Sequence, residues 1–208
     1  MNAVVLAGGR SRRMGFEKAI ADICGRKMIE YVLDALKCSE VDGFVVATSE
    51  RNAPKTKEYC VRMHYDVFET PGRGYHEDIR FIQHHLFREF ISVACDIPFL
   101  RGVHINALIL AYKKEKAMKG RRSITGVVPL SIIPHGFSPS HVIELSNVAE
   151  RVERRVEVVE NKYVAFGLNV VSKNEDAIFV FEDALLGINV NTMAELKLAN
   201  YFMLSRKR

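Results

Sequence analysis

The feature that most constrains the fold is an apolar run that leads directly into a pair of glycines. Residues 2–7 form the run, and Gly8 and Gly9 follow without a break. A short apolar run of this kind is typical of a strand that is buried on both faces of a parallel sheet. Paired glycines let the backbone approach a ligand closely, and open α/β sheets bind ligands at the carboxyl ends of their strands. The sequence therefore predicts a ligand-binding loop directly after its first strand.

Strand and helix patterns alternate through the rest of the first half. Apolar residues recur at helical spacing over 27–37, and Pro54 suits the first turn of a second, short helix. Further helices are expected over 75–88 and from about 102 to 116, with strands at 45–47, 67–68 and 90–95. This alternation predicts an α/β fold in three layers, in which helices cover both faces of a mostly parallel sheet.

The second half is less regular. Strands are expected at 127–128, 150–160, 164–171 and 177–181, a proline-punctuated loop at 129–140 and a closing helix at 193–204. A chain of 208 residues suits one domain with a substantial core. We therefore expect a single domain over residues 1–208.

Composition narrows the class of protein. No apolar run approaches the roughly 18 residues that a membrane span needs, and the first residues form a strand rather than a basic leader, so a cytoplasmic protein is expected. The net charge of +5 suits nucleic acid or a site that gathers phosphate, but no basic motif interleaved with aromatic residues is present. We therefore expect no nucleic-acid partner. The scattered cysteines predict reduced thiols and no metal cluster: Cys24, Cys38, Cys60 and Cys95.

The loop after the first strand carries the strongest functional signal. Its string, LAGGRSRRMGFEK over residues 6–18, is neither a Walker loop nor G-x-G-x-x-G. Backbone N–H groups beside the glycines can cradle phosphate oxygens, and Arg13 and Lys18 supply cationic donors to the same phosphates. Arg12 is expected to face away. A glycine turn with solvated arginines is the structural alternative.

Asp96 directly follows the fourth predicted strand and precedes a proline by two residues. A carboxylate at the carboxyl end of a strand, facing the glycine loop, can hold Mg²⁺. The alternative is a helix cap, which aspartate commonly provides. The glycine loop upstream favours the metal site.

Two further strand ends should lie at the same edge of the sheet. Thr48 ends the second strand and Glu69 the third, and the turn that follows contains Gly74. Guanine presents adjacent N–H donors that one carboxylate can read, which makes Glu69 a candidate for base recognition. An exposed turn residue is the equally weighted alternative.

The glycine-loop string resembles the L-A-G-G-x-S-x-R-M-G-x-x-K signature of nucleotidyltransferases with a Rossmann-like fold, and molybdenum-cofactor guanylyltransferases carry nearly this form. The resemblance implies that the loop binds a nucleoside triphosphate, that Arg13 and Lys18 stabilise the charge as pyrophosphate leaves, and that Asp96 holds the metal. The predicted nucleotide-binding residues are Leu6, Ala7, Gly8, Gly9, Arg10, Ser11, Arg13, Met14, Gly15, Lys18, Thr48, Glu69 and Gly74.

Residues 54–59, 72–78 and 167–172 resemble the archaeal type of GTP:adenosylcobinamide-phosphate guanylyltransferase. The resemblance implies that residues 1–100 bind GTP, that residues 101–208 bind the acceptor, adenosylcobinamide phosphate, and that the acceptor's phosphate attacks the α-phosphorus. Asn169 and Asn189 are candidates for the metal shell or the acceptor, and a turn or cap role is the alternative for each. The sequence of residues 96–99 also resembles that of the molybdenum-cofactor enzymes. A nucleotide-binding regulator without turnover, and a homodimer, are left open.

Overall fold

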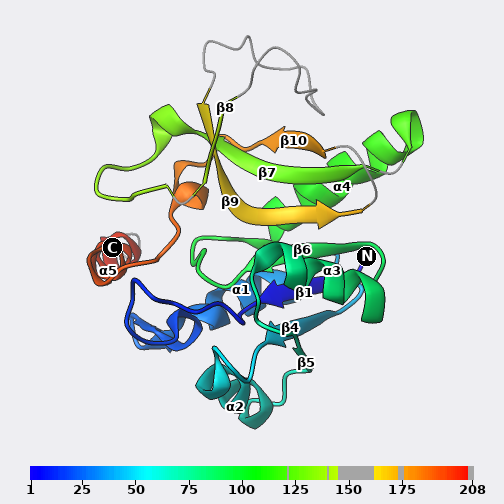
Figure 1. Cartoon of the computed structure of the whole chain (residues 1–208). Coiled ribbons are helices and arrows are strands. Elements are labelled where there is room, and N and C mark those ends of the chain that lie inside the picture. Colours follow the sequence, from blue (N-terminus) through cyan, green and yellow to red (C-terminus); the bar gives the residue numbers. More distant parts are fainter. Residues whose placement is uncertain (121, 140, 145–161, 173–175, 206–208) are drawn as a thin grey trace.

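The computed structural model describes residues 1–120, 122–139, 141–144, 162–172 and 176–205, and within them eight strands form one sheet in the order β10-β7-β9-β6-β1-β4-β5, with β8 paired to β9 (Figure 1). The strands are β1 Ala3–Leu6, β4 Phe44–Thr48, β5 Val67–Glu69, β6 Phe90–Ala94, β7 Ser123–Pro129, β8 Val142–Glu144, β9 Lys162–Val171 and β10 Asp176–Val180. A small hairpin of β2, Asp22–Ile23, and β3, Arg26–Lys27, lies outside this sheet.

The predicted single α/β domain with a mostly parallel sheet is confirmed. Strands β5, β4, β1 and β6 run parallel to one another, as do β7 and β10. Among the described strands of this sheet, only β9 runs in the opposite direction: it lies antiparallel between β6 and β7, and β8 pairs antiparallel with it.

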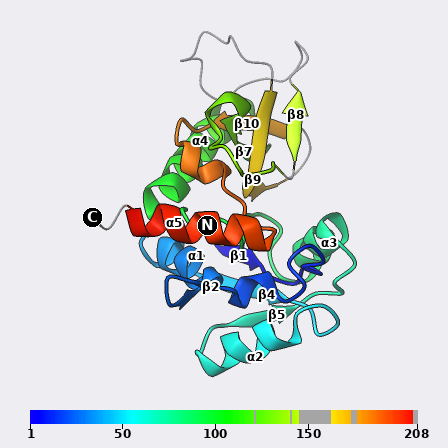
Figure 2. The ribbon, with the colours of Figure 1, turned by 90° about the vertical axis from the view of Figure 1, so that its left-hand side faces the viewer.

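Helices cover both faces of the sheet (Figure 2). They are α1 Met28–Lys37, α2 Pro54–Arg62, α3 Tyr75–His85, α4 Gly102–Lys119 and α5 Met193–Ser205. The alternating side chains of β1 show which helices cover which face of the sheet. Ala3 and Val5 face the core cluster that α1 and α4 share, whereas Val4 faces the cluster beneath α3. The middle strands are thus buried on both faces, which explains their continuous apolar sequence.

The same alternation along β9 divides the second half of the sheet. Phe166, Leu168 and Val170 are buried in the core that α4 covers. The cluster that contains α3 reaches β9 only at Val171. The outer face of β9 and β7 therefore carries only a small cluster of its own, around Tyr163.

The structure departs from the sequence-based expectations in a few places. The β2–β3 hairpin and β8 were not predicted, and α3 ends at His85 rather than near residue 88. The hairpin turns at Cys24 and Gly25, which both have positive φ, a turn that the sequence signals only weakly. The strand expected over 150–160 lies outside the described residues. None of the described helices is long and apolar enough to cross a membrane.

Candidate active site

A cleft of about 730 Å³ opens at the carboxyl ends of β1, β4 and β6. The glycine loop forms one wall, the turn before α3 a second, and residues of β9 and of the segment before α5 complete it. Of the described residues that line the cleft, five are basic and two are acidic: Arg10, Arg12, Arg13, Lys18 and Arg73 against Asp78 and Asp96. The excess of positive charge suits a polyanionic ligand such as a triphosphate.

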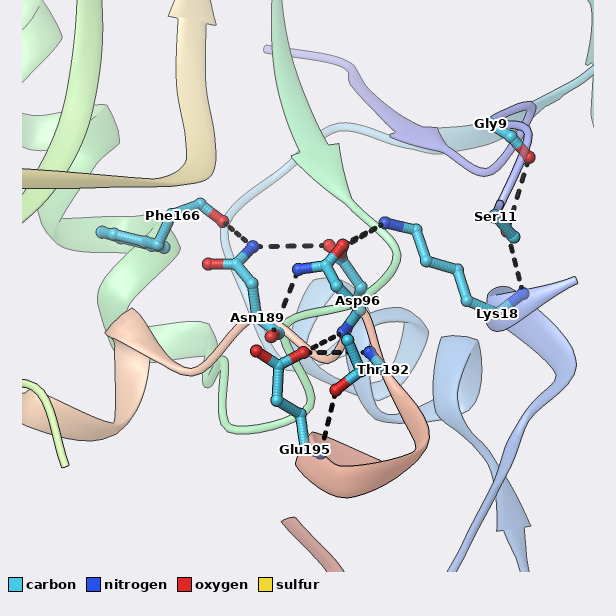
Figure 3. Close-up of polar contacts among 9 residues, drawn as sticks. Gly9, Ser11, Lys18, Asp96, Phe166, Asn189, Thr192 and Glu195 are labelled. Atoms are coloured by element: carbon cyan, nitrogen blue, oxygen red, sulfur yellow. Dashed lines mark hydrogen bonds and ion pairs between the residues drawn. The ribbon is translucent and has the colours of Figure 1, made fainter. Parts of the chain in front are cut away.

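Lys18 and Asp96 meet at the floor of this cleft (Figure 3). The Lys18 ammonium donates to the Asp96 carboxylate and, at 3.2 Å, to Oδ1 of Asn191. Burial is the largest single influence and lowers the pKa of Lys18, but the negative charge of Asp96, its hydrogen bond and the neighbouring Cys95 together raise the pKa overall. Lys18 therefore stays a cation, ready to meet phosphate oxygens.

Asn189 approaches Asp96 from the side opposite to Lys18 (Figure 3). Its amide nitrogen donates to the carbonyl of Phe166 at 3.0 Å and lies 3.5 Å from Oδ1 of Asp96. Its own Oδ1 is buried and has no hydrogen-bond partner within the described residues. A buried acceptor without a partner is costly, so a bound group that the protein alone does not supply is expected here.

The carboxylate of Asp96 fits a magnesium ion. The described residues contain no group of three or more His, Cys, Asp or Glu side chains that could enclose a metal. Mg²⁺ rarely needs such a group, because it is usually held by one or two carboxylates together with water and substrate phosphates. Asp96 provides one such carboxylate, whereas Oδ1 of Asn189 points away from Asp96, because the amide nitrogen of Asn189 is the atom that faces the carboxylate (Figure 3).

A buried glutamate fixes the segment that carries both asparagines. One carboxylate oxygen of Glu195 accepts the backbone N–H groups of Asn191 at 2.8 Å and Thr192 at 2.9 Å, and Oγ1 of Thr192 accepts the N–H of Glu195. The backbone of the same segment bonds directly to the site, since the N–H of Val190 donates to the carbonyl of Asp96 at 2.9 Å. Sequence reasoning missed Asn191 and Glu195 as site residues, although Thr192-x-x-Glu195 is a readable capping box.

The glycine loop is held at both ends. An added Cβ on Gly8 would lie 3.2 Å from the backbone of Thr48 and Ser49, so a glycine permits the close approach to β4. At the far end, Oγ of Ser11 accepts the N–H of Lys18 at 3.1 Å. Met14 packs in a buried cluster rather than lining the cleft. Ala7 is likewise buried outside the lining, and Gly15 serves the loop's conformation with a φ of 80°.

Glu17 ties the loop to α2, a role that sequence reasoning did not find. Its carboxylate accepts the N–H groups of Lys55 at 3.0 Å and Thr56 at 2.6 Å, together with the Thr56 hydroxyl. The helix has no side-chain cap of its own at Ala53, so Glu17 satisfies orphan donors of its first turn. Folding of α2 is thereby coupled to the position of Lys18, the next residue.

Three arginines of the loop line the cleft together. Arg10 and Arg13 do so as expected, but the expectation that Arg12 faces away is wrong, since Arg12 lines the same cleft. The loop is neither a regular strand nor a helix at this point. Side-chain direction therefore cannot be inferred from sequence alternation here.

Only some of the remaining predicted nucleotide-binding residues line the cleft. Glu69 pairs with Lys57 at 2.9 Å and Thr48 is fully buried, and neither lines the cleft, whereas Leu6, Thr70 and Gly74 do. Asn52, which sequence reasoning missed, donates to the carbonyl of Gly72 at 2.7 Å and so joins two walls. Base recognition by Glu69 stays a prediction.

The remaining candidate, Asn169, lies apart from Asp96. Asn169 donates to the hydroxyls of Tyr75 and Ser92, each at 3.3 Å, and does not line the cleft, so of the two predicted asparagines only Asn189 meets Asp96. Cys95, next to Asp96, is buried, and burial raises the pKa of its thiol to about 12. That thiol is therefore not a nucleophile at neutral pH.

Comparison with known proteins identifies the family. The family model for the MobA-like NTP transferase domain matches residues 3–161. The chain belongs to the MobA-like NTP transferase family. It is a nucleotidyltransferase, and the cleft with Lys18 and Asp96 occupies the position at which this α/β fold binds ligands.

Relatives of this NTP transferase include named guanylyltransferases. The chain is 31% identical to the adenosylcobinamide-phosphate guanylyltransferase of Methanocaldococcus jannaschii, over 98% of this chain and 97% of the relative. It is 25% identical to a probable molybdenum cofactor guanylyltransferase of Peptoclostridium acidaminophilum, over 94% and 86% respectively. The fold is that of the CMP:2-keto-3-deoxy-manno-octonic acid synthetase solved with CTP, with a TM-score of 0.72, 15% identity and 99% coverage of both chains.

Proposed function

We propose that this protein transfers GMP from GTP to adenosylcobinamide phosphate and releases pyrophosphate. The observation that carries the proposal is the cleft in which a half-buried lysine and a buried carboxylate meet beneath a loop with three arginines. The full-length similarity to a guanylyltransferase named for that acceptor supports the choice of substrates.

In the proposed reaction an oxygen of the acceptor's phosphate forms a bond to the α-phosphorus of GTP. The bond from that phosphorus to the oxygen bridging the β-phosphorus breaks, and the electron pair leaves with pyrophosphate. The attacking phosphate is already an anion at neutral pH and needs no general base. The protein's contribution is then positioning and charge stabilisation.

The residues divide this work by position. Backbone N–H groups at Gly8 and Gly9 face the phosphates, Arg13 binds them through a planar fork, and Lys18 meets the charge that collects on the leaving group. Asp96 would hold Mg²⁺, which when bound screens phosphate charge and orients the α-phosphate. The Asp96 carboxylate has one oxygen toward the Lys18 ammonium and the other toward the amide nitrogen of Asn189, so two side chains fix its orientation.

The test is incubation of the protein with GTP labelled at the α-phosphate and a panel of phosphorylated acceptors. We expect labelled product and pyrophosphate with adenosylcobinamide phosphate and Mg²⁺, and none when GTP is replaced by ATP. The Lys18→Ala variant is the control for contaminating activity. Labelled product from other phosphorylated acceptors only would contradict the proposed acceptor.

Transfer of GMP to molybdopterin is the second candidate. It is favoured by the similarity to molybdenum cofactor guanylyltransferases, which spans 94% of this chain in one relative. The chemistry at the α-phosphorus would be the same, so only the acceptor panel separates the two candidates.

A further inference from the structure

A second hollow, of about 850 Å³, lies beside the nucleotide cleft. One wall is a face of α3, and the floor is the outer face of β9 and β7. Tyr75, His141, Ala165 and Gly167 line both this hollow and the nucleotide cleft, so the two spaces are continuous. Each by itself has the size of a small-molecule site, roughly 300–1,000 Å³. We call the second one the α3–β9 groove.

The groove arises because side chains along β9 alternate between the two faces of the sheet. Phe166, Leu168 and Val170 point into the core under α4, so the residues between them face the other way. Helix α3 packs on the β1, β4 and β6 part of that face, on the side of the sheet opposite to α1 (Figure 2). Helix α3 does not cover the part of that face over β9 and β7, and this part forms the floor of the groove.

Hydrogen bonds hold the groove open at its two ends. The Asn169 amide donates to the hydroxyl of Tyr75, which fixes the first residue of α3 to the middle of β9. At the far end, Nε2 of Gln83 donates weakly to the carbonyl of Ser172 at 3.4 Å. The wall and the floor are thus tied together, and the space between them is part of the fold rather than a loose surface.

The lining differs in chemistry from that of the nucleotide cleft. Among the described residues that line the groove there is no carboxylate, and Arg80 is the single lysine or arginine. The remainder combines aliphatic side chains such as Ile79 with amide and hydroxyl groups such as Gln83 and Thr125, together with the imidazoles of His76 and His141. These amides and hydroxyls both donate and accept hydrogen bonds. Such a surface suits a large ligand that carries amides of its own.

The junction of the two spaces lies next to the reacting centre. Gly167 has a φ of 97°, and a Cβ there would come within 2.6 Å of the Cβ of Ala94, two residues before Asp96. The neighbouring carbonyl of Phe166 accepts the amide of Asn189, which itself contacts Asp96. A ligand that spans the junction therefore has one end beside Asp96 and the other in the groove.

We propose that the α3–β9 groove binds the amide-rich body of the acceptor while the acceptor's phosphate enters the cleft beside Asp96. This inference rests on the proposed function and adds the site that selects the acceptor. It requires an acceptor that is large and rich in amides, and adenosylcobinamide, a corrin with amides on its periphery, has that chemistry. GTP binding is independent of the groove.

The test fills the groove with a large side chain. Thr125→Trp places an indole over the floor, and Val142→Trp, on the neighbouring strand β8 but outside the lining, is its matched control. His76→Trp on α3 is a second filling variant at an exposed position, and His84→Trp on the same helix is its control. Binding of adenosylcobinamide, which lacks the phosphate, is measured by calorimetry, and transfer to adenosylcobinamide phosphate by steady-state kinetics.

We expect both filling variants to weaken adenosylcobinamide binding by about tenfold or more, which corresponds to ~1.4 kcal/mol. The KM for adenosylcobinamide phosphate should rise in parallel, while GTP affinity and both controls stay at the wild-type level. If the wild type transfers GMP and both filling variants bind the acceptor as well as the wild type does, acceptor binding in the groove is ruled out and the proposed function stands. Adenosylcobinamide binding that the filling variants abolish, without any transfer by the wild type, would support the groove and overturn the proposed function.

Discussion

The Lys18 ammonium donates a hydrogen bond to the Asp96 carboxylate, although the two residues are 78 positions apart in the chain. The glycine loop brings Lys18 from the end of β1, and Asp96 follows β6, the neighbouring parallel strand. The strands before the two residues end at the same edge of the sheet, so the pair lies at the centre of the cleft. The first two predictions test its two members separately.

Lys18→Ala should reduce the rate of transfer more than it weakens GTP binding. The charge on the leaving pyrophosphate grows in the transition state, and interactions stronger in that state raise turnover rather than affinity alone. Loss of one such donor typically costs about 10²–10³-fold in rate. Single-turnover kinetics at saturating GTP measure this. Lys55→Ala, an exposed lysine outside the cleft, is the control. A variant that changes only GTP affinity would place the triphosphate elsewhere.

Asp96→Asn should abolish most turnover while the protein stays folded. Asparagine keeps the shape and the hydrogen bond but loses the charge that a hard cation and Lys18 both need. Turnover is measured over a range of Mg²⁺ concentrations, with circular dichroism to check folding. Near-normal turnover at saturating Mg²⁺ would leave Asp96 with a structural role only, as the partner of Lys18, since the helix that follows begins at Gly102 and Asp96 does not cap it.

GTP should bind more tightly than ATP. A site built to hydrogen-bond the edge of one base rejects another because its own polar groups are then left unpaired. Calorimetric titration with each nucleotide measures the difference, and equal affinities would remove the guanine assignment. The same titration with Glu69→Gln tests whether that carboxylate leaves its ion pair with Lys57 to read guanine, in which case the preference for GTP narrows.

His104 should make the stability of the fold depend on pH. Burial lowers the pKa of its imidazole, the Arg101 guanidinium lowers it further, and Asp183 opposes them only in part. The unfolded chain then binds a proton more readily than the folded one, so stability is complete above the unfolded value of about 6.5 and falls as the pH drops toward the folded pKa.

Urea unfolding at pH 7.5 and at pH 5.5 measures this effect as the difference between wild type and His104→Gln. The variant should lose less stability on acidification, since glutamine does not take up the proton. His84→Gln, which removes an exposed histidine from α3, should behave like the wild type. Equal losses in His104→Gln and the wild type would show that the imidazole is not the group responsible.

Local patterns in the sequence were sufficient for most elements and for both members of the central pair, Lys18 and Asp96. Three examples are the apolar run before Gly8, the helical spacing over 27–37 and the proline at 54. Each pattern reflects how far its own segment is buried or which backbone conformations that segment can adopt. Those properties belong to neighbouring residues, so they can be read without knowing the fold. Lys18 and Arg13 were identified in the same way, because the loop that carries them follows directly from the strand.

Only the tertiary structure decided which distant groups meet. Strand order and direction placed β9 antiparallel between β6 and β7, brought Asn189 to Asp96 and Asn191 to Lys18, and left Asn169 on the groove side. It also turned Arg12 into the cleft and paired Glu69 with Lys57. The periodicity of a segment records how much of it is buried and on which side. It does not record which other segment buries it, since that depends on how the whole chain covers its apolar surface at once.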